Sequence, residues 1–260
     1  MPRARTTTTP HPAAADAALA RSLAIEAGEV LLQIRRSGYT GEGLRAAGDA
    51  GAQAVLARRL DDDRPDDAVL SEEAADDPGR LEASRVWIID PLDGTREFSE
   101  PDRIDWAVHV ALWQDGVLVA GAVAMPADDV CYGTDQPPLL PRRATGPLRL
   151  AVSRTRPPAF VADLAERLGA VLVPMGSAGV KCASVWRGEA DAYVHAGGQF
   201  EWDSAAPVAV ARAVGLHTSR VDGSPLVYNR PDPRLPDLVV CRPEYADQIV
   251  TMTAALAAAG

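Results

Sequence analysis

The sequence predicts an α+β protein in which helices pack on an antiparallel sheet and a half with alternating strands and helices follows. Three observations support this fold class. The first 60 residues show helical periodicity, short apolar runs of strand type come next, and strand-like and helical segments alternate after residue 147. The 260 residues, 47% of them hydrophobic, are enough to bury a large core.

The N-terminal part of this fold is predicted to be helical. In residues 13–36, apolar side chains recur at spacings near three and four, which is typical of an amphipathic helix. A glycine-bearing turn at 38–43 leads to a second predicted helix over 48–60. We expect residues 1–12 to be a disordered tail and the acidic segment 61–67 to be a solvated loop.

Short strands are predicted after the helices. Residues 68–70 and 85–89 are apolar runs of strand length. Residues 106–113 and 117–124 flank an Asp-Gly pair at 115–116, which is typical of a hairpin turn. These four segments form the predicted antiparallel sheet.

A Pro- and Arg-rich segment, residues 136–147, marks the best internal boundary. It separates a predicted N-terminal α+β half, residues 13–146, from a predicted C-terminal α/β half, residues 147–260. In the second half we expect strands over 148–153, 170–174, 190–195 and 237–241, and helices over 158–168, 178–187, 204–214 and 243–258.

Composition excludes several classes of function. Acidic residues number 36 against 26 basic ones, a net charge of −10, so a general DNA- or RNA-coating protein and a polybasic membrane-binding protein are both disfavoured. The three cysteines are widely spaced without a CxxC pair, which argues against a disulfide framework or a structural zinc site. With no signal-peptide pattern and no apolar run of membrane-spanning length, we expect a cytoplasmic protein.

The most informative stretch is VWIIDPLDGTREF, residues 86–98. Pro91 fixes one backbone dihedral and Gly94 allows a sharp turn, so Asp90 and Asp93 are expected close together at the tip of a strand. Two such carboxylates repel each other unless they are protonated or bridged by a cation. Ligands that are all oxygen select Mg²⁺ rather than zinc.

Backbone groups of the same turn are further candidates. The Leu92 carbonyl lies between the two aspartates and could be another metal ligand. The amides of Gly94 and Thr95 begin a new segment and could hold phosphate oxygens. The alternative interpretation is an Asp-rich turn that only satisfies its own backbone.

Three other acidic residues could join this pair. Glu72 and Glu73 follow a strand, and alternation directs their side chains to opposite faces, so one of them could face the aspartates. Asp203 begins a helix in EWDSAA, and Asp49 begins the second predicted helix. The alternatives are a surface Glu pair and two helix caps.

Three motifs, VLSEE at 69–73, WIIDPLDGTREF at 87–98 and EWDSAA at 201–206, occur in an order and at separations that resemble one family. This is the inositol monophosphatase superfamily of Mg²⁺-dependent, lithium-sensitive phosphatases, and the resemblance covers residues 13–258. The REF ending and the segment DGSPLVYN, residues 222–229, resemble its CysQ-type 3′(2′),5′-bisphosphate nucleotidase branch. The resemblance implies a layered α-β-α-β-α sandwich of the inositol monophosphatase and fructose-1,6-bisphosphatase type.

The resemblance also implies a metal site with two or three Mg²⁺ ions. Asp90 would bridge two of them, with Glu72 on the first. The implied metal ligands are Glu72, Asp90, the Leu92 carbonyl, Asp93 and Asp203.

The implied catalytic residues are Glu72, Thr95, which matches the threonine that orients the attacking water, and Asp49. Asp49 matches the acidic residue of a T-x-A-D motif, but this chain reads Ala46-Ala47-Gly48-Asp49 and lacks the threonine. A third-metal or water-positioning role for Asp49 is therefore left open.

The reaction implied is hydrolysis of the 3′-phosphate of adenosine 3′,5′-bisphosphate (PAP) to AMP, with 3′-phosphoadenylyl sulfate as a second substrate, in sulfate assimilation. The alternatives are an inositol or fructose-1,6-bisphosphate phosphatase, and an inactive metal- or nucleotide-binding regulator. The expected partner is a small nucleotide, with neither a nucleic-acid polymer nor a membrane. Relatives often form homodimers, but no interface stripe can be picked from this sequence.

The expected substrate-binding residues are Leu92, Asp93, Gly94, Thr95, Lys181 and Asp203. Lys181 follows the turn that starts at Gly176 and could meet a second phosphate, or it could be a solvated lysine. His195 and Arg96 could each face substrate or not, and His109 is expected to be structural.

Overall fold

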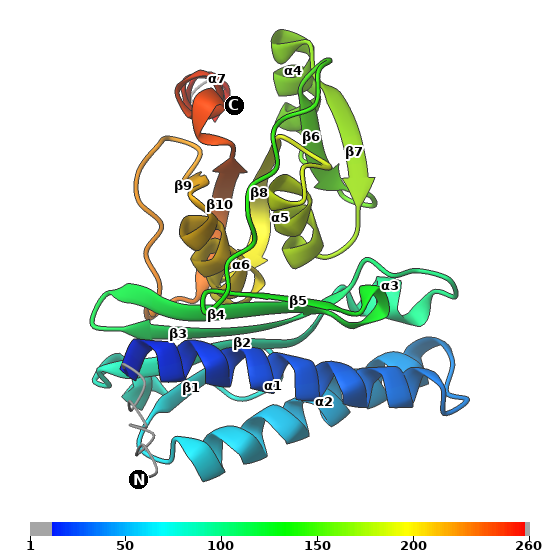
Figure 1. Ribbon diagram of the computed structural model, residues 1–260, viewed down its shortest axis with the longest axis vertical. Helices are drawn as coiled ribbons and strands as arrows, with labels where there is room; N and C mark the ends of the chain where they lie inside the picture. The colour runs from blue at the N-terminus through cyan, green and yellow to red at the C-terminus, as the bar shows by residue number, and fades with distance from the viewer. Residues whose placement is uncertain (1–11, 258–260) are drawn as a thin grey trace, which may run out of the picture.

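The computed structural model describes residues 12–257. Its helices and sheets stack in five layers, α-β-α-β-α, which confirms the expected sandwich (Figure 1). The tail predicted for residues 1–12 lies outside the described residues, except for Pro12, which begins the first helix. Within 12–257 no helix combines the length and the apolar character needed to cross a bilayer.

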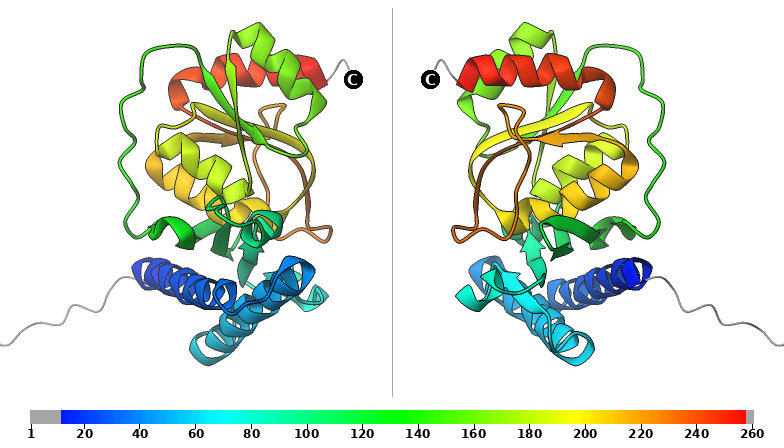
Figure 2. Two further views of the ribbon diagram at one scale, coloured as in Figure 1. Left: turned by 90° about the vertical axis from the view of Figure 1, so that its right-hand side faces the viewer. Right: turned by 90° about the vertical axis from the view of Figure 1, so that its left-hand side faces the viewer.

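The first layer consists of α1 (Pro12–Arg35) and α2 (Gly41–Asp63), which lie side by side on one face of the first sheet (Figures 1 and 2). The structure corrects the predicted start of the second helix from residue 48 to Gly41. Gly41 and Gly43 favour a turn when they are considered locally. Packing of the helix on the sheet overrides that preference.

The acidic segment 61–67 was predicted to be a solvated loop, and the structure corrects this in part. α2 continues to Asp63. The Asp67 carboxylate accepts hydrogen bonds from Arg85 Nε and from Trp87 Nε1, each at 2.8 Å. The segment therefore ties the helical layer to the sheet.

The first sheet contains five strands in sequential order. They are β1 (Ala68–Ser71), β2 (Arg85–Asp93), β3 (Ala107–Gln114), β4 (Val117–Met125) and β5 (Val130–Gly133). The Asp115-Gly116 hairpin is confirmed, since both residues have positive φ, 46° and 96°.

The prediction of a purely antiparallel sheet is wrong at its first strand. β1 pairs in parallel with β2, whereas the other neighbours are antiparallel. The chain returns between these two strands through a 3₁₀ turn, Pro78–Leu81, instead of a tight hairpin. The short strand β5 was not predicted.

The second sheet has the order β7-β6-β8-β10-β9 and stands on the far side of a central helical layer. Its strands are β6 (Arg149–Ser153), β7 (Val171–Met175), β8 (Ala192–Phe200), β9 (His217–Ser219) and β10 (Arg234–Cys241). β9 was not predicted, and β8 extends beyond the predicted residue 195 to its junction with the next helix.

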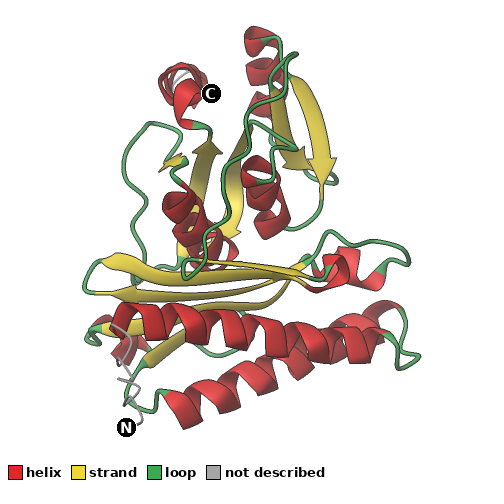
Figure 3. Ribbon diagram, in the orientation of Figure 1, coloured by secondary structure: helices red, strands yellow, loops and turns green. Residues whose placement is uncertain are grey.

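The remaining helices cover both faces of the second sheet (Figure 3). α5 (Ala178–Trp186) and α6 (Glu201–Val214) lie between the sheets, and α4 (Ala159–Leu168) and α7 (Ala246–Ala257) form the outer layer. A short helix, α3 (Thr95–Ser99), follows β2.

The central core joins the two predicted halves. Ile88 and Val123 of the first sheet pack in the same buried cluster as Trp186, Val208 and Tyr193 of the C-terminal half. Segment 136–147, which links β5 to β6, contains no named helix or strand. The sheets are thus held face to face, and the division into halves stays a prediction.

Candidate active site

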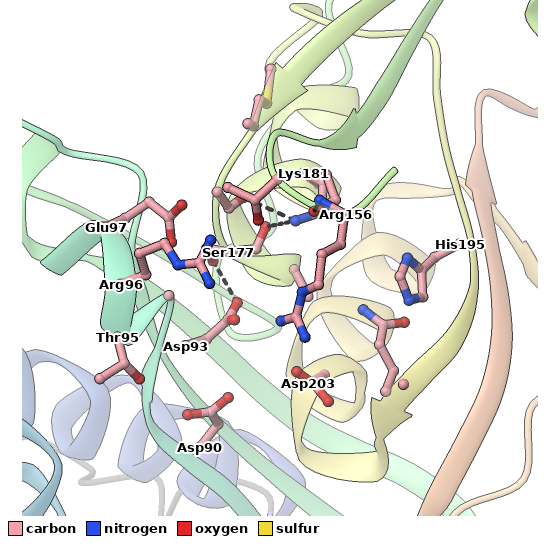
Figure 4. A pocket seen from close by; sticks show the side chains of 18 of the residues that line it. Asp90, Asp93, Thr95, Arg96, Glu97, Arg156, Ser177, Lys181, His195 and Asp203 are labelled. Carbon is pink, nitrogen blue, oxygen red and sulfur yellow. Dashed lines mark hydrogen bonds between the residues drawn. The ribbon is translucent and has the colours of Figure 1, made fainter. Parts of the chain in front are cut away.

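A cavity of about 680 Å³ opens between the two sheets and is called the active-site cavity below (Figure 4). One wall is the turn after β2. The other walls are the loop between β6 and α4, the start of α5, and the end of β8 with the start of α6. The two predicted halves of the chain therefore contribute opposite walls.

The turn after β2 brings Asp90 and Asp93 to this cavity. β2 extends to Asp93, beyond the predicted strand over 85–89, and its pairing with β3 shifts register between Asp90 and Asp93. Pro91 lacks an amide hydrogen and cannot continue the ladder. Gly94 then adopts a left-handed φ of 89° and starts α3.

Asp203 approaches the same pair from the start of α6. Asp90, Asp93 and Asp203 each offer a carboxylate oxygen that lies within 4.8 Å of the others. Asp90 and Asp93 are buried and Asp203 is half-buried. Over residues 12–257, no arginine or lysine forms an ion pair with any of the three.

The electrostatics of this cluster call for a cation. Burial raises the pKa of Asp90 well above its ordinary value, and the charges of Glu72, Asp93 and Asp203 raise it further. Burial and the charge of Asp93 raise the pKa of Asp203 to about 8. A donor set made only of oxygen, buried and without a cationic partner, fits Mg²⁺.

Glu72 lines the active-site cavity beside this cluster, whereas Glu73 does not. Its side chain lies beside Asp90, and burial and the charge of Asp93 raise the pKa of Glu72 to about 7. Of the two neighbouring glutamates, Glu72 is therefore the one that can join the aspartates.

Thr95, Leu92 and Asp49 form one connected group at the base of the turn. The Thr95 hydroxyl donates to the Leu92 carbonyl at 3.1 Å and lies beside Asp49. Burial, followed by the charge of Glu73, raises the pKa of Asp49 to about 6. Since α2 begins at Gly41, Asp49 is in the helix interior, and the cap interpretation is wrong for it.

Asp203 is not the N-cap that the sequence suggested, because α6 begins at Glu201 rather than at residue 204, and its role as a metal ligand stays a prediction. It is the third residue of α6, and its Oδ2 accepts a hydrogen bond from the Phe200 amide at 2.6 Å, as a helix-capping carboxylate does. The same side chain lines the active-site cavity.

Three groups on Asp93 were not anticipated from the sequence. Its Oδ2 accepts from Ser177 Oγ at 2.5 Å and from the Gly179 amide at 2.8 Å. His109 Nε2 lies 3.3 Å from the same oxygen, and His109 Nδ1 lies 3.1 Å from the Trp202 carbonyl. The expectation that His109 is structural is right about its burial but missed its contact with a predicted metal ligand.

Lys181 is buried, so the solvated interpretation is wrong. Its ammonium donates to the carbonyls of Gly176 at 3.0 Å and Ser177 at 2.6 Å, and lies 5.4 Å from the centre of the Tyr193 ring. Burial lowers its pKa. Lys181 therefore fixes the turn that carries Ser177, while contact with a phosphate stays a prediction.

Other polar groups complete the walls of the cavity. His195 lines it and lies 2.6 Å, through Nε2, from the Gly197 carbonyl. Arg96 and Arg156 are exposed toward the cavity. Arg156 was missed in the sequence because it lies in a loop without a motif.

The segment DGSPLVYN does not line the cavity. Tyr228 is buried with its hydroxyl 3.1 Å from Ser204 Oγ, and Asn229 accepts a hydrogen bond from the buried Arg80 at 2.6 Å. The amide of Asn229 also donates to Glu201 at 2.6 Å. This segment supports α6 from behind the active-site cavity.

Comparison with known proteins adds an independent line of observation. A model described as the inositol monophosphatase family matches residues 13–254. A 3′-phosphoadenosine 5′-phosphate phosphatase of Mycobacterium tuberculosis is 54% identical over 231 residues, which cover 85% of this chain and 86% of that protein. The 3′(2′),5′-bisphosphate nucleotidase CysQ of Escherichia coli K12 is 33% identical over 196 residues, 70% of this chain and 78% of that one.

Solved structures share the fold. CysQ from Bacteroides thetaiotaomicron superposes with a TM-score of 0.77 at 26% identity and covers 88% of this chain and 97% of its own. The 2′AMP-bound inositol monophosphatase II known as SaIMPase-II has a TM-score of 0.76 at 22% identity, over 94% of this chain and 98% of that one. The second likeness concerns the fold alone.

Proposed function

The chain belongs to the inositol monophosphatase family, and we propose that it is a metal-dependent phosphatase that removes the 3′-phosphate of PAP to give AMP. One observation carries this proposal beyond the likeness to named PAP phosphatases. The carboxylates of Asp90, Asp93 and Asp203 gather, without an arginine or lysine partner in residues 12–257, at one end of a cavity that is also lined by arginines. Such a cavity can hold both a metal and a phosphorylated nucleotide.

The metal would be held by Asp90, Asp93 and Asp203, with Glu72 and the Leu92 carbonyl as further ligands. We propose two Mg²⁺ ions, which these residues would hold with Asp90 at the centre of the cluster, and leave a third ion open at Asp49. When bound, the ions neutralise the charge of the phosphate monoester and lower the pKa of water.

Residues around this site can orient the reacting groups. The Thr95 hydroxyl donates to the Leu92 carbonyl, so its oxygen is held where it can accept a hydrogen bond from the water that attacks phosphorus. Glu72, beside Asp90, can accept a proton from that water. The amides of Gly94 and Thr95 are candidates for holding the phosphoryl oxygens.

The proposed chemistry is a single displacement. The water oxygen forms a bond to phosphorus while the bond from phosphorus to the ribose 3′-oxygen breaks, and that oxygen is protonated as AMP leaves. Inorganic phosphate is the other product, and no covalent phosphoenzyme is needed.

The wider setting follows from the same proposal. The partner is a small nucleotide, as the names of the relatives support. Activity on 3′-phosphoadenylyl sulfate, a role in sulfate assimilation, a cytoplasmic location, a homodimer and the lack of nucleic-acid or membrane partners are predictions that accompany it.

A phosphate-release panel with Mg²⁺ tests the proposal. It compares PAP with inositol 1-phosphate and fructose 1,6-bisphosphate. These three are chosen because the carboxylate cluster would contact only the phosphate monoester and so would not select the rest of the substrate. We expect a clear preference for PAP and inhibition by millimolar lithium. A preference for either sugar phosphate would overturn the nucleotidase assignment. No phosphate release from any of the three substrates would favour the alternative of an inactive metal- or nucleotide-binding regulator.

A further inference from the structure

Arg156 is a cation of the active-site cavity that the proposed chemistry does not use. It lies in the loop between β6 and α4, and its side chain extends into the cavity beside His195, on the wall across from Thr95 (Figure 4). The backbone of this loop is held in place, because the Arg156 amide donates to Ser153 Oγ at 3.2 Å and two prolines follow.

The guanidinium of Arg156 differs from its basic neighbours in having no partner. Over residues 12–257, no side-chain hydrogen bond or ion pair of Arg156 is formed. Arg154, two residues earlier, is paired with Glu97 at 2.8 Å and Glu100 at 2.9 Å. Lys181 donates to two backbone carbonyls, and Arg45 donates to Ser99.

His195 does not supply positive charge to this wall. Burial lowers its pKa, and the charges of Lys181 and Arg156 act in the same direction. Its imidazole is therefore neutral at neutral pH, and the positive charge beside it comes from Arg156.

Arg96, the other cavity arginine without a partner, has a different place. It belongs to α3 and follows Thr95 directly, so it stands on the wall that carries the predicted metal ligands. A phosphate bound at the carboxylate cluster would lie against the wall that Arg96 lines. Arg156 comes from the second sheet, on the wall that a more distant part of the substrate would reach.

A guanidinium has five N–H donors in a planar arrangement that matches two phosphate oxygens at once. We infer that Arg156 binds the phosphate of the nucleotide that is not hydrolysed, the 5′-phosphate, and so sets the preference for bisphosphate over monophosphate substrates. This inference rests on the proposed function and names a specificity residue within it.

The test compares kcat and KM of wild type, Arg156→Ala and Arg156→Lys on PAP and on adenosine 3′-monophosphate, which lacks the 5′-phosphate. For Arg156→Ala we expect kcat/KM on PAP to fall roughly 10–100-fold, mainly through KM, the size of a charge-assisted contact. Activity on adenosine 3′-monophosphate should stay within about twofold. Arg156→Lys should be intermediate, because it keeps the charge but loses the planar contact.

A matched control is Arg58→Ala, which removes an exposed arginine of α2 outside the cavity and should leave both substrates unaffected. An equal loss on both substrates would place Arg156 on the hydrolysed phosphate and overturn the inference. Unchanged kinetics on both would overturn it as well.

A binding measurement separates this inference from the proposed function. Calorimetric titration with AMP, which keeps the 5′-phosphate, should show at least roughly tenfold weaker binding to Arg156→Ala than to wild type, and adenosine should not distinguish them. If wild type fails to hydrolyse PAP yet binds AMP through Arg156, only the proposed function fails. If AMP binds both proteins equally, the inference fails whatever the activity.

Discussion

The Ser177 hydroxyl donates a hydrogen bond to the Asp93 carboxylate at 2.5 Å, and the two residues are 84 positions apart in the chain. Asp93 ends β2 of the first sheet, and Ser177 precedes α5 in the C-terminal half. The same hydroxyl accepts from the Val180 amide at 3.1 Å and so caps α5. A predicted metal ligand of one half is therefore oriented by a helix start of the other.

Replacing Ser177 by Ala should weaken the metal site more than the fold. Loss of the donor to Asp93 should raise the Mg²⁺ concentration for half-maximal activity by roughly tenfold, as for other residues that orient metal ligands. The lost cap should lower the free energy of unfolding by about 1 kcal/mol. Activity against Mg²⁺ concentration and urea unfolding would measure the two effects.

The control for this change is Asp77→Ala. Asp77 caps the 3₁₀ turn after β1 by accepting from the Gly79 amide at 2.8 Å, away from the active-site cavity. It should lower stability without altering the Mg²⁺ requirement. An unchanged Mg²⁺ requirement in Ser177→Ala would show that the hydrogen bond from Ser177 is not needed to orient the Asp93 carboxylate.

Asp90→Asn tests the bridging carboxylate. It should lower kcat by more than roughly 100-fold, beyond the 10–100-fold typical of groups that only support a ligand. The amide removes a buried charge that Glu72, Asp93 and Asp203 oppose, so the metal-free variant should be at least as stable as wild type. Calorimetric melting in EDTA and in Mg²⁺ should show that Mg²⁺ raises the wild-type Tm but barely moves that of the variant.

Asp115→Asn makes the same chemical change at the exposed β3–β4 hairpin and should behave like wild type in both assays. Near-normal turnover in Asp90→Asn would reject the bridged metal site.

The order of elements could be predicted where the signal is local. The Asp115-Gly116 hairpin depends on two adjacent residues, and the turn after β2 depends on Pro91 and Gly94. The five layers came from the resemblance, since periodicity alone does not say which face of a sheet a later helix will cover.

The contacts that orient Asp93 could not be predicted in this way. His109 reaches it because the β2–β3 register sets His109 opposite Asp90, and Ser177 reaches it because the two sheets stack through α5. Neither contact can be predicted from the spacing of residues along the sequence. The start of α2 at Gly41 could not be predicted from the local glycines, because burial of residues such as Leu44 in the folded protein decides it.

The pH dependence of stability can be tested at Asp16, which joins α1 to the first sheet. Asp16 is buried and accepts hydrogen bonds from Arg85 at 3.0 Å and Arg64 at 3.1 Å. Burial raises its pKa, but the two guanidinium groups outweigh that effect and hold the pKa below 3.8. The folded protein thus binds fewer protons at Asp16 than the unfolded chain does. The contribution of ionised Asp16 to the free energy of unfolding is therefore fully present above pH 3.8 and is lost as the pH falls below that value.

Asp16→Asn should therefore lower the free energy of unfolding by about 2 kcal/mol at pH 7 and at pH 5, the size of hydrogen bonds to a charged group. The difference from wild type should shrink at pH 3.5 and below. Urea unfolding at these pH values measures it, with Asp115→Asn as the control. A difference that stays constant down to pH 3 would mean that packing, rather than charge, carries the effect.

Gly179→Ala tests the close approach of α5 to His109. A Cβ at this position would lie 2.1 Å from His109 Nε2, so the imidazole would have to leave its place beside Asp93. We expect a loss of about 2 kcal/mol in the free energy of unfolding and a raised Mg²⁺ requirement. Gly43→Ala, in the first turn of α2 with no atom within 4 Å of the new Cβ, should be neutral or slightly stabilising.

The collision can be isolated with a second change. His109→Ala removes the atom that the new Cβ meets, so the double variant with Gly179→Ala should be less destabilised than the sum of the two single variants. Because the new Cβ would lie 2.1 Å from His109 Nε2, the coupling free energy reports on this direct contact. Strict additivity of the two free-energy changes would show that α5 shifts to accommodate the methyl group, and that the position of His109 does not depend on Gly179.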